Sequence, residues 1–496
     1  MTPASTGKNS RLLTRAAFAT AHGLPPSATG IRIVHLGLGA FHRAHQAWYT
    51  AHADDTSEWG IAAFTGRSPT AADELRPQGG LFTLIERDDA ADRAEVIGSI
   101  VEAVDGADLA RFVELLSAPK TAIVTITVTE AGYRMTADGL PDDNDVDLQA
   151  DREWLASNLP EGRSPSDSGR LLQNLADRKA PDRANDAPTT TLGRLLLGLA
   201  ARRLAGAGPI AVVPCDNMPS NGRLLSRVVR LLAAEVSSPF ATWVAEQVSF
   251  VSTSVDRITP RMTPADQLIA ERLTGWHDNA PVVTEPFSDW VLSGEFPAGR
   301  PAWERAGARF VDDIEPFENR KLWLLNGAHS LLAYAGLLRG HGTVAEAMAD
   351  ETCRGWVTGF WNEAARRLSA EQLDLDDYRE ALLRRFSNTR IEHRLSQISA
   401  EGVLKLRVRI VPTLLAERAA GRDGAACVRV IGSWAALVLS GAELVDSAGK
   451  AVSRAVSSDQ PVAALLAVID PRLADDENVL AAVSAVVAEH AAPHAR

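Results

Sequence analysis

Residues 31–45 read Ile-Arg-Ile-Val-His-Leu-Gly-Leu-Gly-Ala-Phe-His-Arg-Ala-His. The first six are mostly apolar and rich in β-branched side chains, which predicts a short buried strand. Gly37 and Gly39 follow at once, and a helix is expected to begin after them. In this arrangement the glycines let the backbone approach a pyrophosphate, which binds at the helix N-terminus. The stretch therefore favours a dinucleotide-binding domain, although a strand, turn and helix without a ligand would look the same.

The glycine motif is incomplete. The third glycine of the GxGxxG pattern is replaced by His42, so the motif alone is a weak signal. The candidate cofactor contacts in this turn are Gly37, Gly39, Ala40, Phe41 and His42.

The residues that follow support the cofactor interpretation. A helical stretch at 44–53 leads to a second apolar strand at 59–64, which completes a βαβ unit. An acidic residue at the end of this second strand commonly holds the ribose 2′-hydroxyl of NAD. Here Arg67 and Ser68 come instead, and they could face the 2′-phosphate of NADP. The expected cofactor is NAD or NADP, and the choice stays open.

A long β-branched run at 121–128 predicts a central strand of a parallel sheet. It ends in Thr129 and Glu130, at the carboxyl end of a strand, where open α/β sheets bind ligands. Weaker runs at 81–85 and 96–100 predict a peripheral pair of strands.

Two later strands also end in polar side chains. The apolar run 209–214 is followed by Asn217, and the β-rich run that begins at residue 250 ends in Asp256 and Arg257. Polar residues at the end of a buried strand are candidates for a site. Each also has an ordinary explanation, because an Asn-rich turn can cap the next helix and an Asp-Arg pair can be structural.

A further stretch, 318–329, reads Glu-Asn-Arg-Lys-Leu-Trp-Leu-Leu-Asn-Gly-Ala-His. On an α-helix, at about 100° per residue, Glu318, Lys321, Asn326 and His329 would share an arc of about 140°. Leucines and a tryptophan cover most of the remaining surface, which predicts a buried helix. Buried polar groups need partners. The helix is therefore either a solvated surface element or part of a site, in about equal measure on its own evidence.

The order of these patterns predicts an α/β Rossmann-type N-terminal domain followed by a mostly α-helical C-terminal domain. We place a poorly ordered arm at 1–29, the dinucleotide-binding domain at 30–309 with an exposed excursion at 140–190, and the helical domain at 310–496. The polar helix would then lie at the seam of the two domains, a common position for an active site.

Composition narrows the function classes. The net charge of −12 argues against binding to nucleic acid or to anionic membranes. The three cysteines fit neither a zinc site nor a disulfide framework, which favours a reducing compartment. No apolar run reaches the length of a membrane span, and the N-terminal apolar runs are too short for a signal peptide. We expect a cytoplasmic protein.

Taken together, the motifs resemble the polyol-specific long-chain dehydrogenases of the mannitol dehydrogenase family. The stretches that carry the resemblance are HLGLGAFHRAHQAWYT from His35, TVTEAGY from Thr127, CDNMPSNG from Cys215, FVSTSVDRITP from Phe250, NRKLWLLNGAHS from Asn319 and, more loosely, RRFSNTRIEHRLSQISAEGVLKL from Arg384. They span roughly residues 30 to 450.

The resemblance implies an NAD(P)-dependent enzyme that interconverts a secondary alcohol of a sugar alcohol or aldonate with a ketone, without a metal. It implies that Lys321 is the general base and that Asn217 and Asn326 donate hydrogen bonds to the reacting oxygen. It also implies that His329 orients the substrate and that Glu318 relays the proton to solvent.

The resemblance extends to the substrate side chains but does not fix the substrate. Asp256 would bind a substrate hydroxyl, and Lys405 would contact the distal end of the chain. Gln397 stands where the mannitol 2-dehydrogenase branch has an arginine, and the surrounding sequence is closer to the mannonate (fructuronate reductase) branch. Arg394 could pair with a uronate carboxylate together with Lys405, or it could be a surface charge.

Two alternatives stay open. A mannitol-1-phosphate dehydrogenase would need several cations around a phosphate, which Arg385, Arg394 and Lys405 could supply. A nucleotide-binding regulator that has lost catalysis is a remote alternative. The expected partner is a small polyol or keto-sugar.

Overall fold

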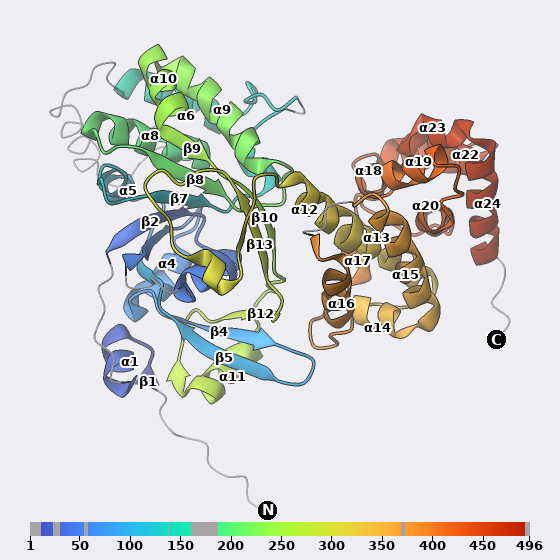
Figure 1. Cartoon of the computed structure of the whole chain (residues 1–496), viewed down its shortest axis with the longest axis horizontal. Helices are drawn as coiled ribbons and strands as arrows, with labels where there is room; N and C mark the ends of the chain where they lie inside the picture. The colour runs from blue at the N-terminus through green and yellow to red at the C-terminus, as the bar shows by residue number, and fades with distance from the viewer. Residues whose placement is uncertain are drawn as a thin grey trace, which may run out of the picture. The chain divides into compact units, whose positions relative to one another are not determined.

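The computed structural model describes residues 11–22, 30–53, 58–136, 138–159, 187–368 and 373–491. The chain divides into two compact units, Met1–Ile314 and Glu315–Arg496. The first unit is α/β and the second is helical (Figure 1).

A six-stranded parallel sheet forms the centre of the N-terminal unit, in the order β6-β3-β2-β7-β8-β9. These strands are β2 (Ile31–Leu36), β3 (Gly60–Phe64), β6 (Ile100–Val104), β7 (Ile123–Ile126), β8 (Ile210–Pro214) and β9 (Val248–Phe250). Numbered as the chain visits them, their spatial order is 3-2-1-4-5-6, the Rossmann arrangement. The predicted fold class is confirmed. The first strand, β2, lies at the middle, so the turn after it is at the point where the strand order reverses.

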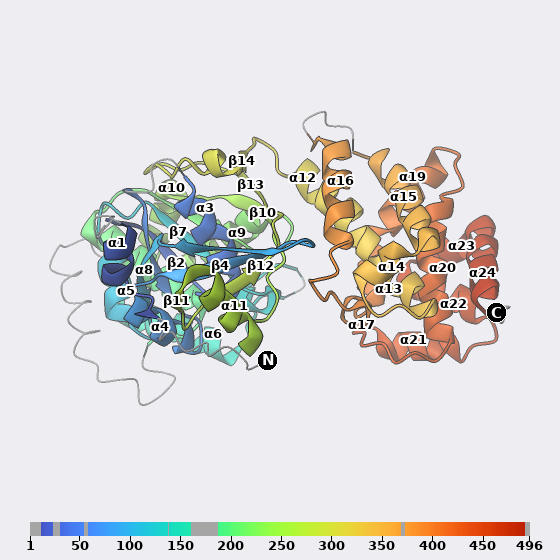
Figure 2. The same ribbon diagram turned by 90° about the horizontal axis from the view of Figure 1, so that it is seen from below.

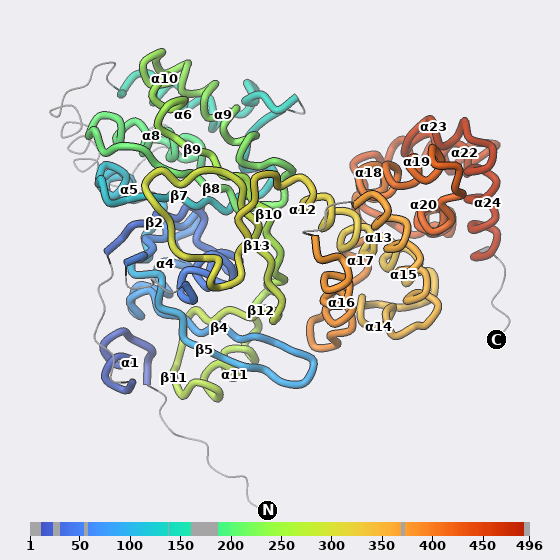
Figure 3. The backbone as a smooth tube through the Cα atoms, viewed as in Figure 1, coloured from blue at the N-terminus to red at the C-terminus, as the bar shows by residue number. Residues whose placement is uncertain are grey.

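Helices cover both faces of this sheet. On one face, a single apolar core joins the sheet to five helices. Figure 3 shows three of them, α8, α9 and α10, on the side of the sheet opposite to α4. The five helices are α5 (Leu109–Leu116), α6 (Val146–Asn158), α8 (Thr191–Ala205), α9 (Asn221–Val236) and α10 (Ser238–Gln247). A second core on the other face includes the helical segments after β2, which are α2 (Ala40–His42), η1 (Arg43–Ala47) and α3 (Trp48–Ala51), together with α4 (Thr70–Leu75).

Two smaller sheets complete this second face. One has the order β12-β4-β5 and the other β10-β13-β14. Their strands are β4 (Phe82–Arg87), β5 (Asp92–Ile97), β10 (Ser252–Asp256), β12 (Val282–Thr284), β13 (Asp289–Ser293) and β14 (Arg309–Phe310). Figure 2 shows β4 and β12 beside α11 (Pro264–Thr274). The predicted peripheral pair is confirmed in part, because β4 pairs with β5, which ends at Val96 and Ile97. The bounds 96–100 were wrong, because residues 98–99 separate β5 from β6, and β6 joins the main sheet.

The N-terminal segment is more ordered than we expected. Strand β1 (Arg11–Leu12) pairs in parallel with β11 (Trp276–His277), and helix α1 (Arg15–His22) follows it. Leu13 is fully buried in a small apolar cluster with Trp276. Residues 1–10 and 23–29 of the expected arm lie outside the described residues.

The expected excursion at 140–190 contains one well-packed helix. Leu148 and Leu155 of α6 are buried in the core beneath the main sheet. The carboxylate of Asp151 accepts hydrogen bonds from the backbone N–H groups of Thr189 (2.8 Å) and Thr190 (2.9 Å), so the two ends of the segment are joined. Residues 160–186 lie outside the described residues.

The C-terminal unit consists of helices packed around α13. It contains α12 (Glu315–Arg320), η6 (Lys321–Asn326), α13 (Gly327–Leu338), α14 (Val344–Ala349), α15 (Glu351–Ala365), α16 (Leu375–Phe386), α17 (Leu395–Ile398), α18 (Gly402–Arg409), α19 (Val411–Ala419), α20 (Ala425–Leu439), α21 (Gly449–Val456), α22 (Pro461–Ile469), α23 (Pro471–Asp475) and α24 (Glu477–Ala491). Helix α13 packs against α15, α17 and α20, and α20 packs against α24. Ten of the twelve residues of α13 are buried, as its sequence predicted. Among the described residues, no helix is both long enough and apolar enough to cross a membrane.

Candidate functional site

The turn after β2 depends on a glycine at its first position. Gly37 has φ = 107°, a conformation that residues with a side chain rarely adopt. A Cβ at this position would also collide with the carbonyl oxygen of Thr127, which follows β7. Gly39 differs, because its φ of −143° suits any residue and the nearest atom to a Cβ there would be 3.6 Å away. It leaves open space beside the start of the helix.

His42 explains how the helix tolerates the missing third glycine. Its ring is fully buried and stacks on the ring of His35 in β2, with the ring centroids 3.3 Å apart. Directly after it, η1 takes a π-helical form. A π segment inserts an extra residue into a turn. Here it coincides with the bulky ring that lies between helix and sheet. The His42 side chain therefore belongs to the core, whereas Ala40 and Phe41 are partly exposed.

The loop after β3 leaves the cofactor question open. Arg67 and Ser68 are both exposed, and the hydroxyl of Ser68 lies 2.6 Å from that of Thr70. Thr65, by contrast, is buried and accepts a hydrogen bond from the N–H of Gly106. Neither a ribose hydroxyl nor a 2′-phosphate is specifically favoured by these contacts.

Two loops at the carboxyl ends of β7 and β8 are joined by a buried hydrogen bond. The hydroxyl of Tyr133 donates to the carboxylate of Asp216, which also accepts from the N–H of Met218 at 2.8 Å. Thr129 and Glu130 on the first loop, and Asn217 on the second, are exposed. The loop that carries Asn217 is thus held from below by Asp216.

Asn221 fixes the other end of the same loop. Its side-chain amide donates to the carbonyl oxygen of Thr253 (3.1 Å) and its carbonyl accepts from the Thr253 N–H (2.8 Å). Sequence reasoning did not assign roles to Tyr133, Asp216 or Asn221. All three lie within the motif stretches, but nothing local distinguishes a residue that supports a loop from one that faces a ligand.

Asp256 and Arg257 have different positions. Asp256 ends β10 and is 9% exposed. The Arg257 side chain is fully buried, donating to the carbonyl oxygen of Ala44 (2.7 Å) and to the carboxylate of Glu86 (2.7 Å) and lying over the ring of Trp48. Arg257 therefore connects the helical segment after β2 with the β4 sheet and does not pair with its neighbour.

The polar helix of the C-terminal unit contains a π turn. Residues Lys321–Asn326 are π-helical, and the N–H of Gly327 donates to the carbonyl of Leu322, five residues earlier. Residues five apart are therefore neighbours on one face, as residues four apart are in an α-helix. The predicted angle of about 140° between Lys321 and Asn326 was wrong, because it assumed an α-helix. In the π form these two residues lie on the same face. Both side chains are partly exposed, as is Glu318.

His329 lies one turn further along, in α13. It is 9% exposed, its ring lies 4.9 Å from that of His393, and its Nε2 has no hydrogen-bond partner among the described residues. Burial holds the pKa of His329 well below its usual range, and nearby positive charges from Arg385, Arg409 and Lys405 act in the same direction. The imidazole is neutral at physiological pH, so one ring nitrogen can donate and the other accept.

Two cations from α18 lie close enough to act on His329. Lys405 donates to the carbonyl oxygen of Ile398 at 2.8 Å, and Arg409 donates to the carbonyl oxygen of Asn326 and to the hydroxyl of Ser330, both at 3.1 Å. Burial, and then the charge of Arg409, lower the pKa of Lys405 to about 8. Within the ranges that the structure covers, neither cation forms a salt bridge. Sequence reasoning did not identify Arg409.

Arg394 and Gln397 are placed differently from Lys405. Arg394 is more than half exposed and pairs with Glu392 at 2.5 Å, in the form of a surface charge. Gln397 is also exposed.

Comparison with known proteins places this geometry in a family. The sequence matches the mannitol dehydrogenase Rossmann domain over residues 31–305 and the mannitol dehydrogenase C-terminal domain over residues 313–490. The chain belongs to the mannitol dehydrogenase family. It is an oxidoreductase, as the motifs predicted.

Relatives and a solved structure cover most of this mannitol dehydrogenase family member. It is 34% identical to the D-mannonate oxidoreductase of Escherichia coli over 90% of this chain and 84% of the relative. It is 35% identical to a mannitol 2-dehydrogenase of Aspergillus terreus over 78% of this chain and 74% of the relative. The ternary complex of Pseudomonas fluorescens mannitol 2-dehydrogenase with NAD and D-mannitol matches 93% of this chain and 92% of that chain, with 31% identity and a TM-score of 0.70.

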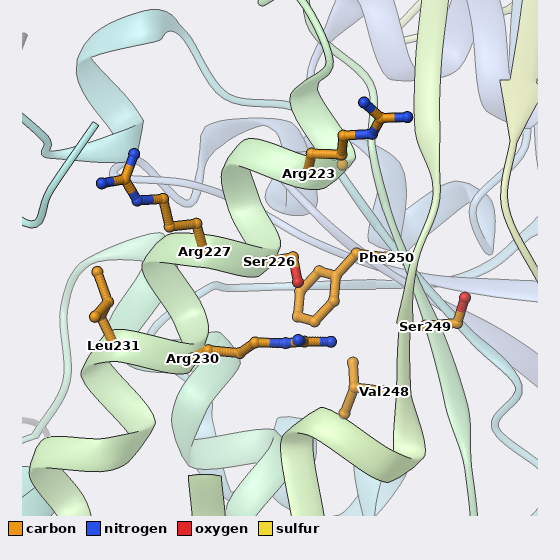
Figure 4. A pocket seen from close by; sticks show the side chains of 9 residues that line it. Arg223, Ser226, Arg227, Arg230, Leu231, Val248, Ser249 and Phe250 are labelled. Carbon is orange, nitrogen blue, oxygen red and sulfur yellow. The ribbon is translucent and has the colours of Figure 1, made fainter. Parts of the chain in front are cut away.

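The N-terminal unit also has an open groove of about 660 Å³ beside the edge strand β9. Arg223, Arg227 and Arg230 line it from one face of α9, and Phe250 lines it from β9 (Figure 4). Charged side chains beside an edge strand discourage pairing with another chain, which is sufficient reason for this patch.

One group of side chains in the C-terminal unit has metal-ligand chemistry. Ligand atoms of His341, Asp350 and Cys353 lie within 4.8 Å of one another. The Asp350 carboxylate, however, already accepts from Arg339 at 2.6 Å and from the N–H of Thr352 at 2.8 Å. Asp350 is thus the N-cap of α15 and is paired with Arg339, which explains the cluster without a metal ion.

Proposed function

We propose that this chain is an NAD(P)-dependent dehydrogenase of acyclic sugar acids, of the D-mannonate/D-fructuronate type. The observation that carries the proposal is the pair of partly buried cations on α18, Lys405 and Arg409, which donate to backbone carbonyls and form no salt bridge in the described part of the chain. Buried positive charge is unfavourable unless an anion compensates it. The carboxylates of Glu401 and Asp446 act on Lys405 without forming a salt bridge with it in the described ranges, and a substrate carboxylate would complete the compensation.

The turn after β2 supports binding of a dinucleotide. Gly37 brings the backbone close to the strand end at Thr127, and Gly39 leaves space beside the helix that begins at Ala40. A pyrophosphate binds in such a place through backbone N–H groups. The solved relative whose title names NAD matches almost the whole chain, which further supports this cofactor. Arg67, Ser68, Thr129 and Glu130 are the expected contacts beyond the turn.

The bound nicotinamide supplies the hydride acceptor when the alcohol is oxidised. Lys321 takes the hydroxyl proton on its Nζ as the C–H hydride leaves, and Glu318 passes that proton to solvent. Negative charge builds on the reacting oxygen, so the amides of Asn217 and Asn326 stabilise the transition state by donating to it. Neutral His329 and the carboxylate of Asp256 orient substrate hydroxyls.

The acidic substrate is preferred over a neutral polyol for electrostatic reasons. Three positive charges, those of Lys405, Arg409 and Arg385, act on His329 and lower its pKa. Positive charge around His329 favours a negatively charged substrate. Arg394 is proposed as a peripheral contact at most, because it is paired with Glu392 at the surface.

A neutral polyol of the D-mannitol/D-fructose type is the second candidate. The structural relative with D-mannitol bound favours it. A panel of ketones distinguishes the two: D-fructuronate, D-tagaturonate, D-fructose and D-fructose 6-phosphate, each with NADH and with NADPH. We expect the highest kcat/KM with a uronate. Turnover with fructose alone would replace the acidic substrate by a polyol, and turnover with fructose 6-phosphate alone would replace it by a sugar phosphate.

The first prediction concerns the base. Lys321→Ala should lose on the order of 100-fold or more in kcat, because the proton acceptor is removed, while cofactor affinity is kept. Steady-state rates in both directions and a fluorescence titration with NADH measure the two effects. Lys450→Ala, at the distant helix α21, is the matched control and should behave like the unaltered enzyme. Unchanged turnover of Lys321→Ala would contradict the role of the lysine as base.

A further inference from the structure

We infer that Arg409 is a positioning residue that holds the π turn Lys321–Asn326 in the form needed for catalysis. The inference rests on the proposed roles of Lys321 and Asn326. Arg409 does not belong to the motifs that carry the family resemblance, and its link to the π turn is visible only in the structure.

The contact is made where the π turn meets α13. One guanidinium nitrogen, Nη1, donates to the carbonyl oxygen of Asn326, the last π-helical residue. The same nitrogen donates to the hydroxyl of Ser330, which in turn donates to the same carbonyl at 3.1 Å. Two donors, Arg409 and Ser330, thus converge on the carbonyl of the residue whose side chain is proposed to bind the reacting oxygen.

A π turn needs such support. Its hydrogen bonds connect residues five apart, and the form is rare outside functional sites. Shifting the turn back to α-helical geometry would move Asn326 by about 100° around the axis relative to Lys321. The Asn326 carbonyl is the point at which the two geometries separate. A fixed donor at this point therefore selects the π form.

An arginine at this position is costly to bury. Its guanidinium is largely buried, its Nε has no hydrogen-bond partner in the described ranges, and burial lowers its pKa. The charge also acts on its neighbours, since it contributes to the lowered pKa values of His329 and Lys405. A lysine or glutamine could tie two helices together at smaller cost. The rigid fork of arginine is suited to a fixed position of the carbonyl.

Arg407 offers a matched comparison on the same helix. It donates to the carbonyl oxygens of Ile469 (3.0 Å) and Val468 (3.1 Å), at the end of α22, and it is exposed. Both arginines thus connect α18 to a neighbouring helix through backbone carbonyls. Only Arg409 does so at the π turn.

The experiment compares Arg409→Met, Arg409→Lys and Arg407→Met in the full chain. For Arg409→Met we expect kcat to fall on the order of 10- to 100-fold, as for other small misplacements of reacting groups, with NADH affinity unchanged. Its kcat–pH profile should also shift to higher pH, because a positive charge near His329 and Lys405 is gone. Arg409→Lys should recover the pH profile but not kcat. Arg407→Met should keep both.

The outcomes separate this inference from the proposed function. If Arg409→Met turns over within twofold of the unaltered enzyme while Lys321→Ala is inactive, the base is correct and the positioning role is overturned. Equal losses in both methionine variants, with pH profiles unchanged, would show a purely structural role and overturn it too. If Arg409→Met does not fold, the decision rests on Arg409→Lys, for which full kcat would overturn the inference.

Discussion

Lys405 provides the sharpest residue-level test of the substrate's charge. Its pKa is lowered to about 8 by burial and by Arg409, so its ammonium is charged below about pH 8 and neutral above it. An attraction between Lys405 and a substrate carboxylate is thus present at lower pH and is lost as the pH rises through about 8.

We therefore predict that KM for an acidic keto-sugar increases several-fold between about pH 7 and about pH 9, while KM for fructose does not. Initial-rate measurements in the reduction direction at a series of pH values give both constants. Lys405→Arg keeps its charge throughout and should remove the pH dependence of KM. A parallel increase for the neutral sugar would contradict the charge interaction.

At the scale of single elements, two π-helical segments were beyond sequence reasoning. Periodicity correctly predicted that the helix at 318–329 has little exposed surface, since seven of its twelve residues are buried and the other five are partly buried. It could not predict a π turn, since the extra residue depends on contacts from α18 and not on local preferences. The same holds for η1, where the ring of His42 requires space against β2. Sequence patterns thus identified both the helical segment after β2 and the helix at 318–329. They gave a wrong angle between Lys321 and Asn326 in the latter.

The two glycines of the turn after β2 are required for different reasons: Gly37 for the backbone conformation, and Gly39 for the space that it leaves. Gly37→Ala should be strongly destabilised, by about 1–3 kcal/mol or more, since a Cβ is strained at φ = 107° and collides with Thr127. Gly39→Ala should fold normally, because its backbone suits any residue. It should nevertheless weaken NADH binding, because the added methyl takes up space where the pyrophosphate is proposed to lie.

Thermal unfolding and NADH titration of both variants measure these effects. Gly39→Ala with an unchanged melting temperature and unchanged NADH affinity would place the dinucleotide elsewhere. Gly37→Ala with an unchanged melting temperature would contradict the steric argument independently.

For the whole molecule, the sequence predicted an α/β unit followed by a helical one because strands β2, β3, β7 and β8 are short, mostly apolar runs. The edges of the main sheet were harder. Strand β6 is separated from β5 by only two residues, and β9 has three residues, so neither forms a distinct pattern. Pairing with a distant strand decides whether such short segments become strands, and a local pattern does not contain that information.

The N-terminal segment shows the same limitation at its clearest. Its few apolar residues predict no stable structure alone, yet Arg15 reaches across the unit and donates to the backbone carbonyl oxygens of Gly79, Gly98 (2.8 Å) and Ile100. Gly79 precedes β4, Gly98 lies between β5 and β6, and Ile100 is the first residue of β6. Arg15 thus substitutes for strand pairing at a place where the backbone would otherwise lack donors.

We predict that Arg15→Met lowers the free energy of unfolding of the N-terminal unit by about 1–3 kcal/mol, because three carbonyls lose their donor. The melting temperature should fall by a few degrees, as about 2–4 °C per kcal/mol is usual for units of this size. Arg11→Met, in the exposed strand β1 of the same segment, is the control and should melt as the unaltered chain does. Calorimetry on both variants decides the point. Equal melting temperatures would mean that the segment rests on the unit without stabilising it, whereas a loss confined to Arg15→Met establishes that it is an integral part of the fold.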